Sequence, residues 1–560
     1  MAVLLLALLA CPSVATAAGI FRVDAASTAP TPDGQSWATA FPGIQAAVDA
    51  AFGAGGGEVW VKEGTYTSTT DPVVTMQANV HLYGGFAGGE TSRAERDWGA
   101  HVTAIDGENA RCCVVGADDA TLDGFTVQNG TTSLGGGMRN ASSSPTVTNC
   151  TFTANAASDR GGGMYNESSS PTVTNCTFSG NVATEYGAGM YNDSSSPAVS
   201  HCTFSENMAA TNSASGGGMC NHSSSSPTVT DCTFSGNSVM FGGGGMSNSF
   251  SSPTVTNCTF ADNSTDYSGG GGIKNYFCNP TVINCAFTCN DGASDGGGML
   301  NISSSPTVTN CAFSGNTAAN FGGGMRNSDS SSPTVTNCTF SENTAISYDG
   351  GGMYNSYCSP AVTNCTFSKN AAPNGGGMSN DYFSSPWVTN CTFSGNAASQ
   401  DGGGMYNSYE SSPTVMHCTL SGNTATDYGG GMRNYASSRP TLINCTISEN
   451  AALNGGGIFH SGDCTPTLIN CIIWGHSNGA FVNPATVTYS CIEGGYAGVG
   501  NIDLDPLLGS LGNHGGAVDT YPIGTFSPAR DSGVRCFLDV GGTLFYEIPG
   551  GGGYATADGA

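Results

Sequence analysis

Charged residues are scarce in this sequence, and basic residues are the scarcest. Only 10% of the residues are charged, and 14 Lys and Arg stand against 41 Asp and Glu, which gives a formal net charge of -27. Such an excess of carboxylates repels phosphate backbones, so the composition argues against nucleic acid and against polyanionic sugars as partners. It is compatible with divalent cations, and equally with the plain solubility of an extracellular surface.

Long apolar runs are also missing. The run from Ala2 to Ala10 is too short to span a bilayer, and Ala15–Ala17 forms a small-residue cleavage site, so residues 1–18 resemble a secretory signal peptide without its usual basic start. The stretch Leu8–Cys11 also resembles a bacterial lipobox, which leaves lipidation at Cys11 and simple cleavage both open. No later segment is apolar enough to cross a membrane. We therefore expect a bacterial protein that is secreted or associated with the cell surface or outer membrane.

Leucine is nearly absent from the part of the chain that repeats. The unit reads P-T-V-T-N-C-T-F-S-G-N, then a short variable loop, then G-G-G-M-Y-N and a serine run. Leucine-rich repeats, which have a similar period, need leucines at fixed offsets, and Thr, Asn, Ser and Gly are poor in helix interiors. With both of these repeat types excluded, the unit is best explained by short β-strands bounded by Asn and Gly. Spacings of 26 or 27 residues, and once 30, separate the in-phase cysteines Cys150, Cys176, Cys202, Cys232, Cys258, Cys285, Cys311, Cys338, Cys365, Cys391, Cys418, Cys445 and Cys471.

The order of apolar residues within a unit predicts how the chain bends. Strict alternation along a strand cannot place both Val147 and Cys150 on one face. A corner at Asn149 resolves this, because Asn tolerates the left-handed conformation. A second corner near Asn155 and a third strand with Met138 inward complete the unit. The sequence therefore predicts an all-β fold, a single-stranded right-handed parallel β-helix of about 13 regular coils with three strands each.

Four regions follow from this pattern. Residues 1–18 are the signal peptide, residues 19–100 an N-terminal cap with the first irregular coils, residues 101–493 the β-helix repeats, and residues 494–560 a C-terminal cap with a flexible tail. An open stack exposes strand edges, so caps are needed at both ends. We expect a short helix over residues 44–52 to cover the N-terminal end.

The 23 cysteines suggest a thiol ladder more than a disulfide framework. The in-phase cysteines should point inward in parallel and remain reduced, as small hydrophobic residues. The sequon at Asn149–Thr151 follows the same period, so we interpret it as a structural corner. Zinc is not expected, because no close Cys/His cluster exists. The better disulfide candidates are the out-of-phase residues Cys112, Cys113, Cys278, Cys289 and Cys358.

Two sets of side chains are candidate binding residues. Asp159 and Glu185 share one offset in adjacent coils, which fits shared Ca²⁺ ligation, a close carboxylate pair, or a solvated loop. Apart from a possible Ca²⁺, no cofactor is expected. Similar acids, not in consecutive register, are Asp295, Asp349, Asp401 and Asp427. A row that follows the inward methionines should face solvent and could stack on sugar rings or partner proteins, or simply on itself: Tyr165, Tyr191, Tyr354 and Tyr406.

The GGGM-x-N and F-S-G-N elements resemble the repeats of chlamydial polymorphic outer membrane proteins. More broadly, residues 101–493 look like right-handed β-helix proteins of the pectate-lyase-like superfamily. The resemblance implies a surface-exposed, adhesin-like protein. The superfamily also includes polysaccharide lyases and glycoside hydrolases, so a carbohydrate-active enzyme is the alternative.

Basic residues are few and scattered in the repeats, and no polygalacturonase-type motif is recognisable, so no catalytic residue is assigned. Fold alone does not confer activity. The sequence therefore favours an exported structural or adhesin-like monomer, without a transmembrane segment after the signal, whose partner is a polysaccharide or a surface protein.

Overall fold

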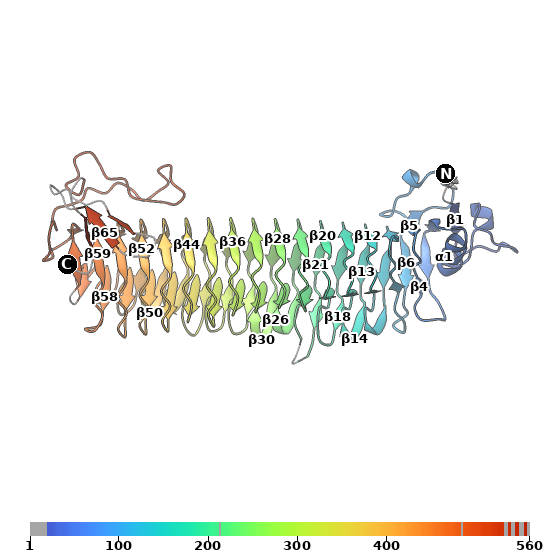
Figure 1. Cartoon of the computed structure of the whole chain (residues 1–560), viewed down its shortest axis with the longest axis horizontal. Helices are drawn as coiled ribbons and strands as arrows, with labels where there is room; N and C mark the ends of the chain where they lie inside the picture. The colour runs from blue at the N-terminus through green and yellow to red at the C-terminus, as the bar shows by residue number, and fades with distance from the viewer. Residues whose placement is uncertain are drawn as a thin grey trace, which may run out of the picture.

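The computed structural model is a long rod of stacked parallel coils, with the two chain termini at opposite ends (Figure 1). It describes residues 19–211, 214–482 and 485–530, together with the backbone of three short strands between residues 536 and 556. The predicted signal peptide and Cys11 lie outside the described residues. The rod is a parallel β-helix of about 16 turns. The predicted number of about 13 is too small, because irregular coils without the cysteine signature add turns at both ends.

Most regular coils contain four strands, and the last two, at Cys445 and Cys471, contain three. In one four-stranded coil the strands are β40 (Thr334–Thr336), β41 (Thr339–Ser341), β42 (Thr344–Ala345) and β43 (Met353–Ser356). They belong to four sheets, named A, B, D and C in that order, with 18, 17, 12 and 16 strands among the described residues. The prediction of three strands per coil is therefore wrong. Two-residue strands such as β42 are too short to show an alternating pattern in the sequence.

Like residues stack on like residues throughout the interior. Val335, Phe340 and Met353 are fully buried, as are their equivalents in neighbouring coils. The rings of Phe313 and Phe340 stack with centroids 4.7 Å apart and an interplanar angle of 3°. The predicted valine, cysteine, phenylalanine and methionine columns are confirmed. Each coil buries its apolar face only against its neighbours.

The asparagine corner and the cysteine that follows it satisfy the backbone together. Asn337 has the left-handed φ of 54°, and its Nδ2 donates to Oδ1 of Asn310 over 3.1 Å. The N–H of Cys338 donates to Sγ of Cys365 over 3.4 Å, and the Cys338 thiol donates to the Thr336 carbonyl over 3.2 Å. A thiol here occupies the space of a small hydrophobe and also serves as donor and acceptor.

Every cysteine of the described residues is free. The reduced ladder is confirmed, and the disulfide prediction for the out-of-phase cysteines is wrong. Cys358 is buried at a serine position of the repeat, where its N–H donates to Oγ of Ser384 over 3.1 Å. A cysteine can therefore replace a serine at this position without forming a disulfide bond. Those five residues are Cys112, Cys113, Cys278, Cys289 and Cys358, of which Cys289 alone is exposed.

Two further asparagine rows lie inside the rod. Asn355, in the sheet C strand β43, donates from Nδ2 to Oδ1 of Asn380 over 2.8 Å. Asn343, which ends the F-S-E-N segment, donates from Nδ2 to the Phe313 carbonyl and to Oδ1 of Asn370, both over 2.9 Å. These side chains are completely buried. Buried amides are tolerated because each one has hydrogen-bond partners in the coils above and below.

The ends of the rod are covered differently. Helix α1 (Ile44–Gly53) packs on β1 (Gly19–Val23) and β2 (Gly57–Lys62) and confirms the predicted capping helix. At the other end, residues 508–523 fold back over the outer face of sheet B. There the Tyr521 hydroxyl lies 2.6 Å from Oγ of Ser421. None of the helices in the described ranges is long and apolar enough to cross a bilayer.

Candidate functional site on the outer face of sheet C

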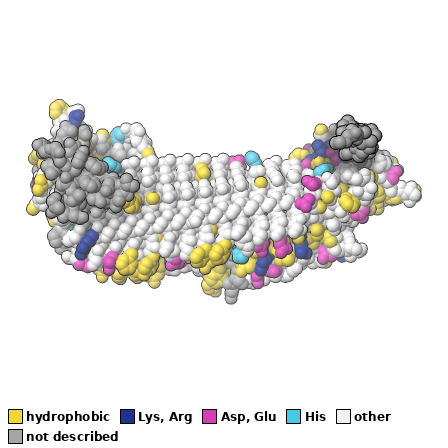
Figure 2. Space-filling model, in the orientation of Figure 1, with side chains coloured by type: hydrophobic (Ala, Val, Ile, Leu, Met, Phe, Trp, Pro, Cys, Tyr) yellow, Lys and Arg dark blue, Asp and Glu magenta, His cyan; other side chains and the backbone are white. Residues whose placement is uncertain are grey.

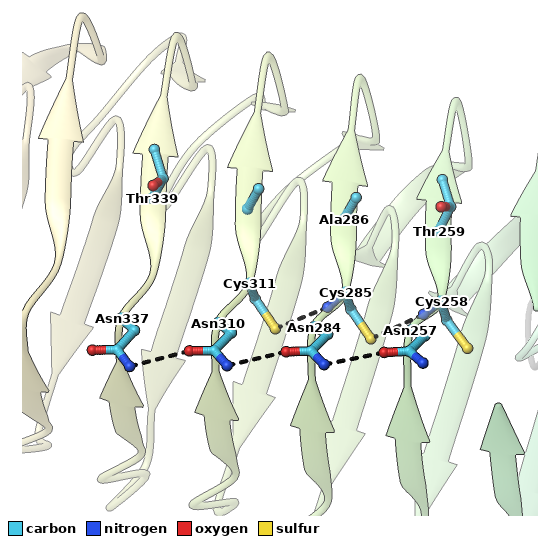
Figure 3. A pocket seen from close by; sticks show the side chains of 11 residues that line it. Asn257, Cys258, Thr259, Asn284, Cys285, Ala286, Asn310, Cys311, Asn337 and Thr339 are labelled. Carbon is cyan, nitrogen blue, oxygen red and sulfur yellow. Dashed lines mark hydrogen bonds between the residues drawn. The ribbon is translucent and has the colours of Figure 1, made fainter. Parts of the chain in front are cut away.

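A shallow hollow of about 490 Å³ runs along the asparagine corner between sheets A and B (Figure 3). It exists because Ala286 and Ala312 replace the threonine that Thr259 and Thr339 provide in the flanking coils. The side-chain amides along it already bond to one another from coil to coil. The hollow therefore offers few free polar groups to a ligand. Its corner residues are Asn257, Asn284, Asn310 and Asn337.

The predicted tyrosine row is not exposed. Tyr165 and Tyr191 point away from the core, yet they are only 3% and 2% exposed and stack with ring centroids 5.6 Å apart. The loop before the glycine triplet covers them, with Arg160 over the Tyr191 ring at 5.4 Å. Tyr354 is buried as well, and Tyr406 is half-buried. The prediction that these rings face solvent is wrong, because the variable loops fold over sheet C.

The predicted acidic pair is adjacent, as expected from its register. The N–H of Glu185 donates to the Asp159 carbonyl over 2.9 Å. The Asp159 carboxylate pairs with Arg160 at 3.1 Å and is 39% exposed. Among the described residues, no group of three or more His, Cys, Asp or Glu side chains is arranged to hold a metal ion. Calcium ligation at this pair stays a prediction.

Charged side chains are rare along the middle of the rod and gather at its ends and along one edge (Figure 2). Five neighbouring strands of sheet C lie beside a group of charged side chains. They are β39 (Met325–Ser328), β43, β47 (Met378–Asp381), β51 (Met405–Asn407) and β55 (Met432–Asn434). The residue after each inward methionine points outward, and the parallel register aligns these side chains in one row. In order, the row is Arg326, Tyr354, Ser379, Tyr406 and Arg433.

Two aspartates lie along one side of this row, just before the glycine triplets. Asn374 pairs with Asp349 on one side and with Asp401 on the other, so the three residues occupy consecutive coils. Asn374 Nδ2 donates to Asp349 Oδ1 over 2.9 Å, and the N–H of Asp401 donates to Asn374 Oδ1 over 3.2 Å. The sequence pointed to both acids, but not to the asparagine that connects them.

Asp381 lies on the other side of the row. It ends β47 and points outward like Ser379, two residues before it. Its carboxylate accepts hydrogen bonds from the Tyr354 hydroxyl at 3.2 Å and from the Ser408 hydroxyl at 2.5 Å. The N–H of Tyr382 donates to it as well, over 3.0 Å. Sequence reasoning missed Asp381, because it follows the strand instead of preceding a glycine triplet; the signal was an acid where β43 has Ser356.

Burial and mutual repulsion shift the titration of these carboxyl groups. Burial raises the pKa of Asp349 to about 6. The nearby charges of Asp381 and Asp401 also raise it, whereas the hydrogen bond from Asn374 lowers it. Burial also raises the pKa of Asp381 and that of Asp401. At Asp401 the positive charge of Arg433 opposes this rise. Within the described residues, Asp349 and Asp381 form no ion pair. Two of the three acids of the site therefore lack a cation in the described part of the chain, and Arg433 serves the third, Asp401.

The two arginines are held at the ends of the row. Arg326 pairs with Asp295 and lies over the Phe321 ring at 5.2 Å. Arg433 is 7% exposed, pairs with Asp401 at 3.4 Å and lies over the Phe459 ring at 4.6 Å. Its Nη1 has no hydrogen-bond partner among the described residues.

Ser379 occupies the centre of the row. It is fully buried, and its Oγ has no hydrogen-bond partner in the described part of the chain. A buried hydroxyl without a partner costs free energy, so Ser379 differs from the hydrogen-bonded asparagines of the interior. The tyrosines of β43 and β51 flank it on either side.

An exposed column of aromatic rings borders the site. Tyr357, Tyr382 and Tyr409 occupy the turns after sheet C, with left-handed φ values of 55°, 46° and 47°. Their rings stack at 5.3 and 4.9 Å, so the ring edges and hydroxyls face outward. The same turn has a positive φ in other coils, as at Ser303 and Ala436, so this backbone conformation belongs to the repeat. The backbone contact of Tyr382 with Asp381 joins this column to the acids.

A family model described as the right-handed β-helix region matches residues 99–260, 242–385 and 362–489. The chain belongs to this family. Together the three matches cover the regular coils and the candidate site. The resemblance to chlamydial outer membrane proteins stays a prediction.

The curated proteins and the solved structures add more distant likenesses. The chain is 35% identical over 88 residues to a mannuronan C5-epimerase of Azotobacter vinelandii, a match that covers 14% of this chain and 9% of that protein. A tailspike protein of the Acinetobacter baumannii bacteriophage Fri1, a capsular polysaccharide depolymerase, is 12% identical with a TM-score of 0.28, over 72% of this chain and 58% of that one. The A-module of another Azotobacter vinelandii mannuronan C-5 epimerase is 13% identical with a TM-score of 0.24. This match covers 76% of the present chain and 94% of the A-module chain.

Proposed function

We propose that this protein is an extracellular glycan-binding rod whose site lies on sheet C between Arg326 and Arg433. The observation that carries the proposal is the gathering of Asp349, Asp381 and Asp401 around tyrosines and an unpartnered buried serine. Carboxylates and hydroxyls bond to sugar hydroxyls, and tyrosine rings contact the apolar faces of sugar rings. Asp159 and Glu185 also lie near a tyrosine, Tyr186, but among the described residues no unpartnered buried hydroxyl accompanies them.

Display outside the cell, as an adhesin or a stalk, is part of the same proposal. The signal-like start of the sequence supports export, and a rigid rod can hold a binding site away from a surface. The fraction of the chain recovered from the cell surface or the medium tests this placement. Purely cytoplasmic recovery of the full-length chain would contradict it.

The binding site is tested with the purified full-length chain on a glycan microarray. We expect the wild-type protein to bind a subset of glycans and the double variant Asp381→Asn/Asp401→Asn to lose that binding. Asp193→Asn is the matched control, because Asp193 ends β19 (Met190–Asp193) as Asp381 ends β47. The control should bind like the wild type. No binding to any glycan, or equal loss in the control, would argue against the site.

Glycan cleavage is a second candidate, favoured by the raised pKa of Asp349 beside Asp381. A carboxylic acid that keeps its proton near pH 6 and a neighbouring carboxylate are the two groups that acid–base cleavage of a glycosidic bond needs. Release of reducing or unsaturated ends from a panel of polysaccharides measures it. If cleavage occurs, Asp349→Asn should abolish turnover. Turnover unchanged in this variant would exclude Asp349 as the acid.

A further inference from the structure

Two of the three acids around Ser379 have no cation to balance them among the described residues. Arg326 pairs with Asp295 and Arg433 pairs with Asp401, at opposite ends of the row. Asp349 and Asp381 are left without an ion pair among the described residues. We propose that these two carboxylates bind the ammonium group of an amino sugar, so that the ligand of the rod is a cationic glycan. The proposal rests on the glycan-binding function proposed above.

The charge of the site favours a positively charged ligand. The three carboxylates repel one another, and this repulsion contributes to the raised pKa of Asp349. An ammonium between Asp349 and Asp381 would relieve it, and partial burial would strengthen the attraction compared with water. The formal net charge of -27 acts in the same direction over longer distances.

The arrangement suits an ammonium better than a metal ion. The described residues contain no group of three or more His, Cys, Asp or Glu side chains that could hold one metal ion. An ammonium group instead donates up to three hydrogen bonds to acceptors that lie farther apart. Asp349, Asp381 and Ser379 can supply those acceptors, since Ser379 Oγ is unpartnered. Tyr354 and Tyr406 flank it, and aromatic rings attract cations.

Other groups at the site point to a sugar in preference to a lysine side chain. The hydroxyls of Ser379 and Tyr354 and the unpartnered Nη1 of Arg433 form a floor that can bond to several hydroxyls. A lysine side chain would present one ammonium and an apolar stem, and it would leave Arg433 Nη1 without a partner. Tyr354 and Arg433 are three strands apart, so a chain of sugar rings that carries both ammonium groups and hydroxyls can use all of these groups.

Titration calorimetry of the full-length chain compares two probes, fully deacetylated glucosamine hexamer and the matched N-acetylated hexamer. The buffer is held just above the pKa of about 6 of Asp349, so that this carboxyl group is mainly ionised while much of the amine stays charged. We expect binding of the deacetylated hexamer, and about tenfold or more weaker binding of the acetylated one, because a charged hydrogen bond is lost. Asp381→Asn should weaken the first probe by a similar factor, and Ser379→Ala, a smaller change, should weaken it severalfold. Asp193→Asn, the matched control, should leave it unchanged, with the melting temperature of each variant checked.

The outcomes separate this inference from the proposed function. Equal binding of both hexamers, lost in Asp381→Asn, would overturn the cationic ligand and leave glycan binding intact. Binding of neither hexamer, together with an empty glycan array, would overturn both. A lysine-rich peptide that binds in an Asp381-dependent way, when the deacetylated hexamer does not, would replace the amino sugar by a protein partner and overturn the inference.

Discussion

At the scale of single residues, asparagine has two different roles in each coil. Corner residues such as Asn310 provide a left-handed φ, here 54°, on an exposed surface. Inner residues such as Asn316 are fully buried, and the Oδ1 of Asn316 accepts hydrogen bonds from both the backbone and the side chain of Asn290. The same residue type therefore contributes through conformation in one place and through hydrogen bonds in the other.

Replacing these two asparagines should have unequal costs. Asn316→Ala leaves two buried donors of Asn290 without an acceptor, so we expect a loss of about 3 kcal/mol or more in unfolding free energy. Asn310→Ala loses the residue that best tolerates the left-handed region and should cost about 1 kcal/mol. Urea denaturation of both variants checks the order. A larger loss at Asn310 would contradict it.

The titration of Asp349 should make the stability depend on pH. Its pKa rises from 3.8 to about 6 on folding, so the folded state binds the proton more tightly than the unfolded state. Its contribution is therefore greatest at low pH and decreases as the pH rises from about 4 to about 6. Asp349→Asn should remove that decrease and add about 2–3 kcal/mol near neutral pH. Identical pH profiles of melting temperature for the two proteins would contradict the prediction.

Thiol reactivity should distinguish Cys289 from the ladder. Cys289 is exposed, whereas burial raises the pKa of ladder thiols such as Cys391 well above the ordinary value. Thiols that are buried and protonated react slowly. Brief alkylation of the native chain, followed by peptide mass mapping, should modify Cys289 first among the cysteines of the described coils. Comparable labelling of Cys391 before unfolding would contradict the ladder.

At the scale of elements, the segment 508–523 is held on sheet B by a few specific contacts. The Tyr521 hydroxyl lies 2.6 Å from Oγ of Ser421 and donates to Glu449 over 3.2 Å. The Thr392 hydroxyl donates to the Asp519 carbonyl over 2.6 Å. Because the segment buries a single apolar side chain, Val518, it should detach without unfolding the coils.

Removing one side chain should therefore release the segment. We expect Tyr521→Ala to speed proteolytic cleavage between residues 508 and 523 severalfold, with the melting temperature of the rod nearly unchanged. Tyr521→Phe keeps the ring and is the control for the hydroxyl contacts. Limited proteolysis with mass mapping measures the rates. A fall in melting temperature comparable to a core substitution would show that the segment is part of the folding unit.

The elements also show how far the sequence could be interpreted. Val147, Asn149, Cys150 and Phe152 were placed correctly, because identical coils must stack identical residues and only one bend allows it. Sheet D was missed, since two-residue strands carry no period. The burial of Tyr165 could not be predicted, because it depends on loops whose sequence varies from coil to coil. The acidic site combines residues from three such irregular positions, and no single repeat contains it.

At the scale of the whole molecule, the coils are interchangeable units stacked along one axis. Deleting residues 177–202 joins Cys176 to Thr203, which keeps the order of the repeat unchanged. We expect a folded rod shorter by one strand spacing, about 4.8 Å, as measured by small-angle scattering with a preserved β-sheet circular dichroism spectrum. Deleting residues 177–189 removes part of a coil and should prevent folding. A folded product from the partial deletion would contradict the register.

The buried amides of sheet C also give the rod a chemical direction. In every coil of this row Nδ2 donates toward the C-terminal end, as Asn355 does to Asn380. Within the described residues, the row begins with a carbonyl oxygen of Asn140 that has no partner and ends with an unpartnered amide nitrogen of Asn434. Further strands of sheet C cover both ends of the row in the intact rod, so only fragments cut within the row could extend it, and only head to tail. Joining like ends would place acceptor against acceptor or donor against donor.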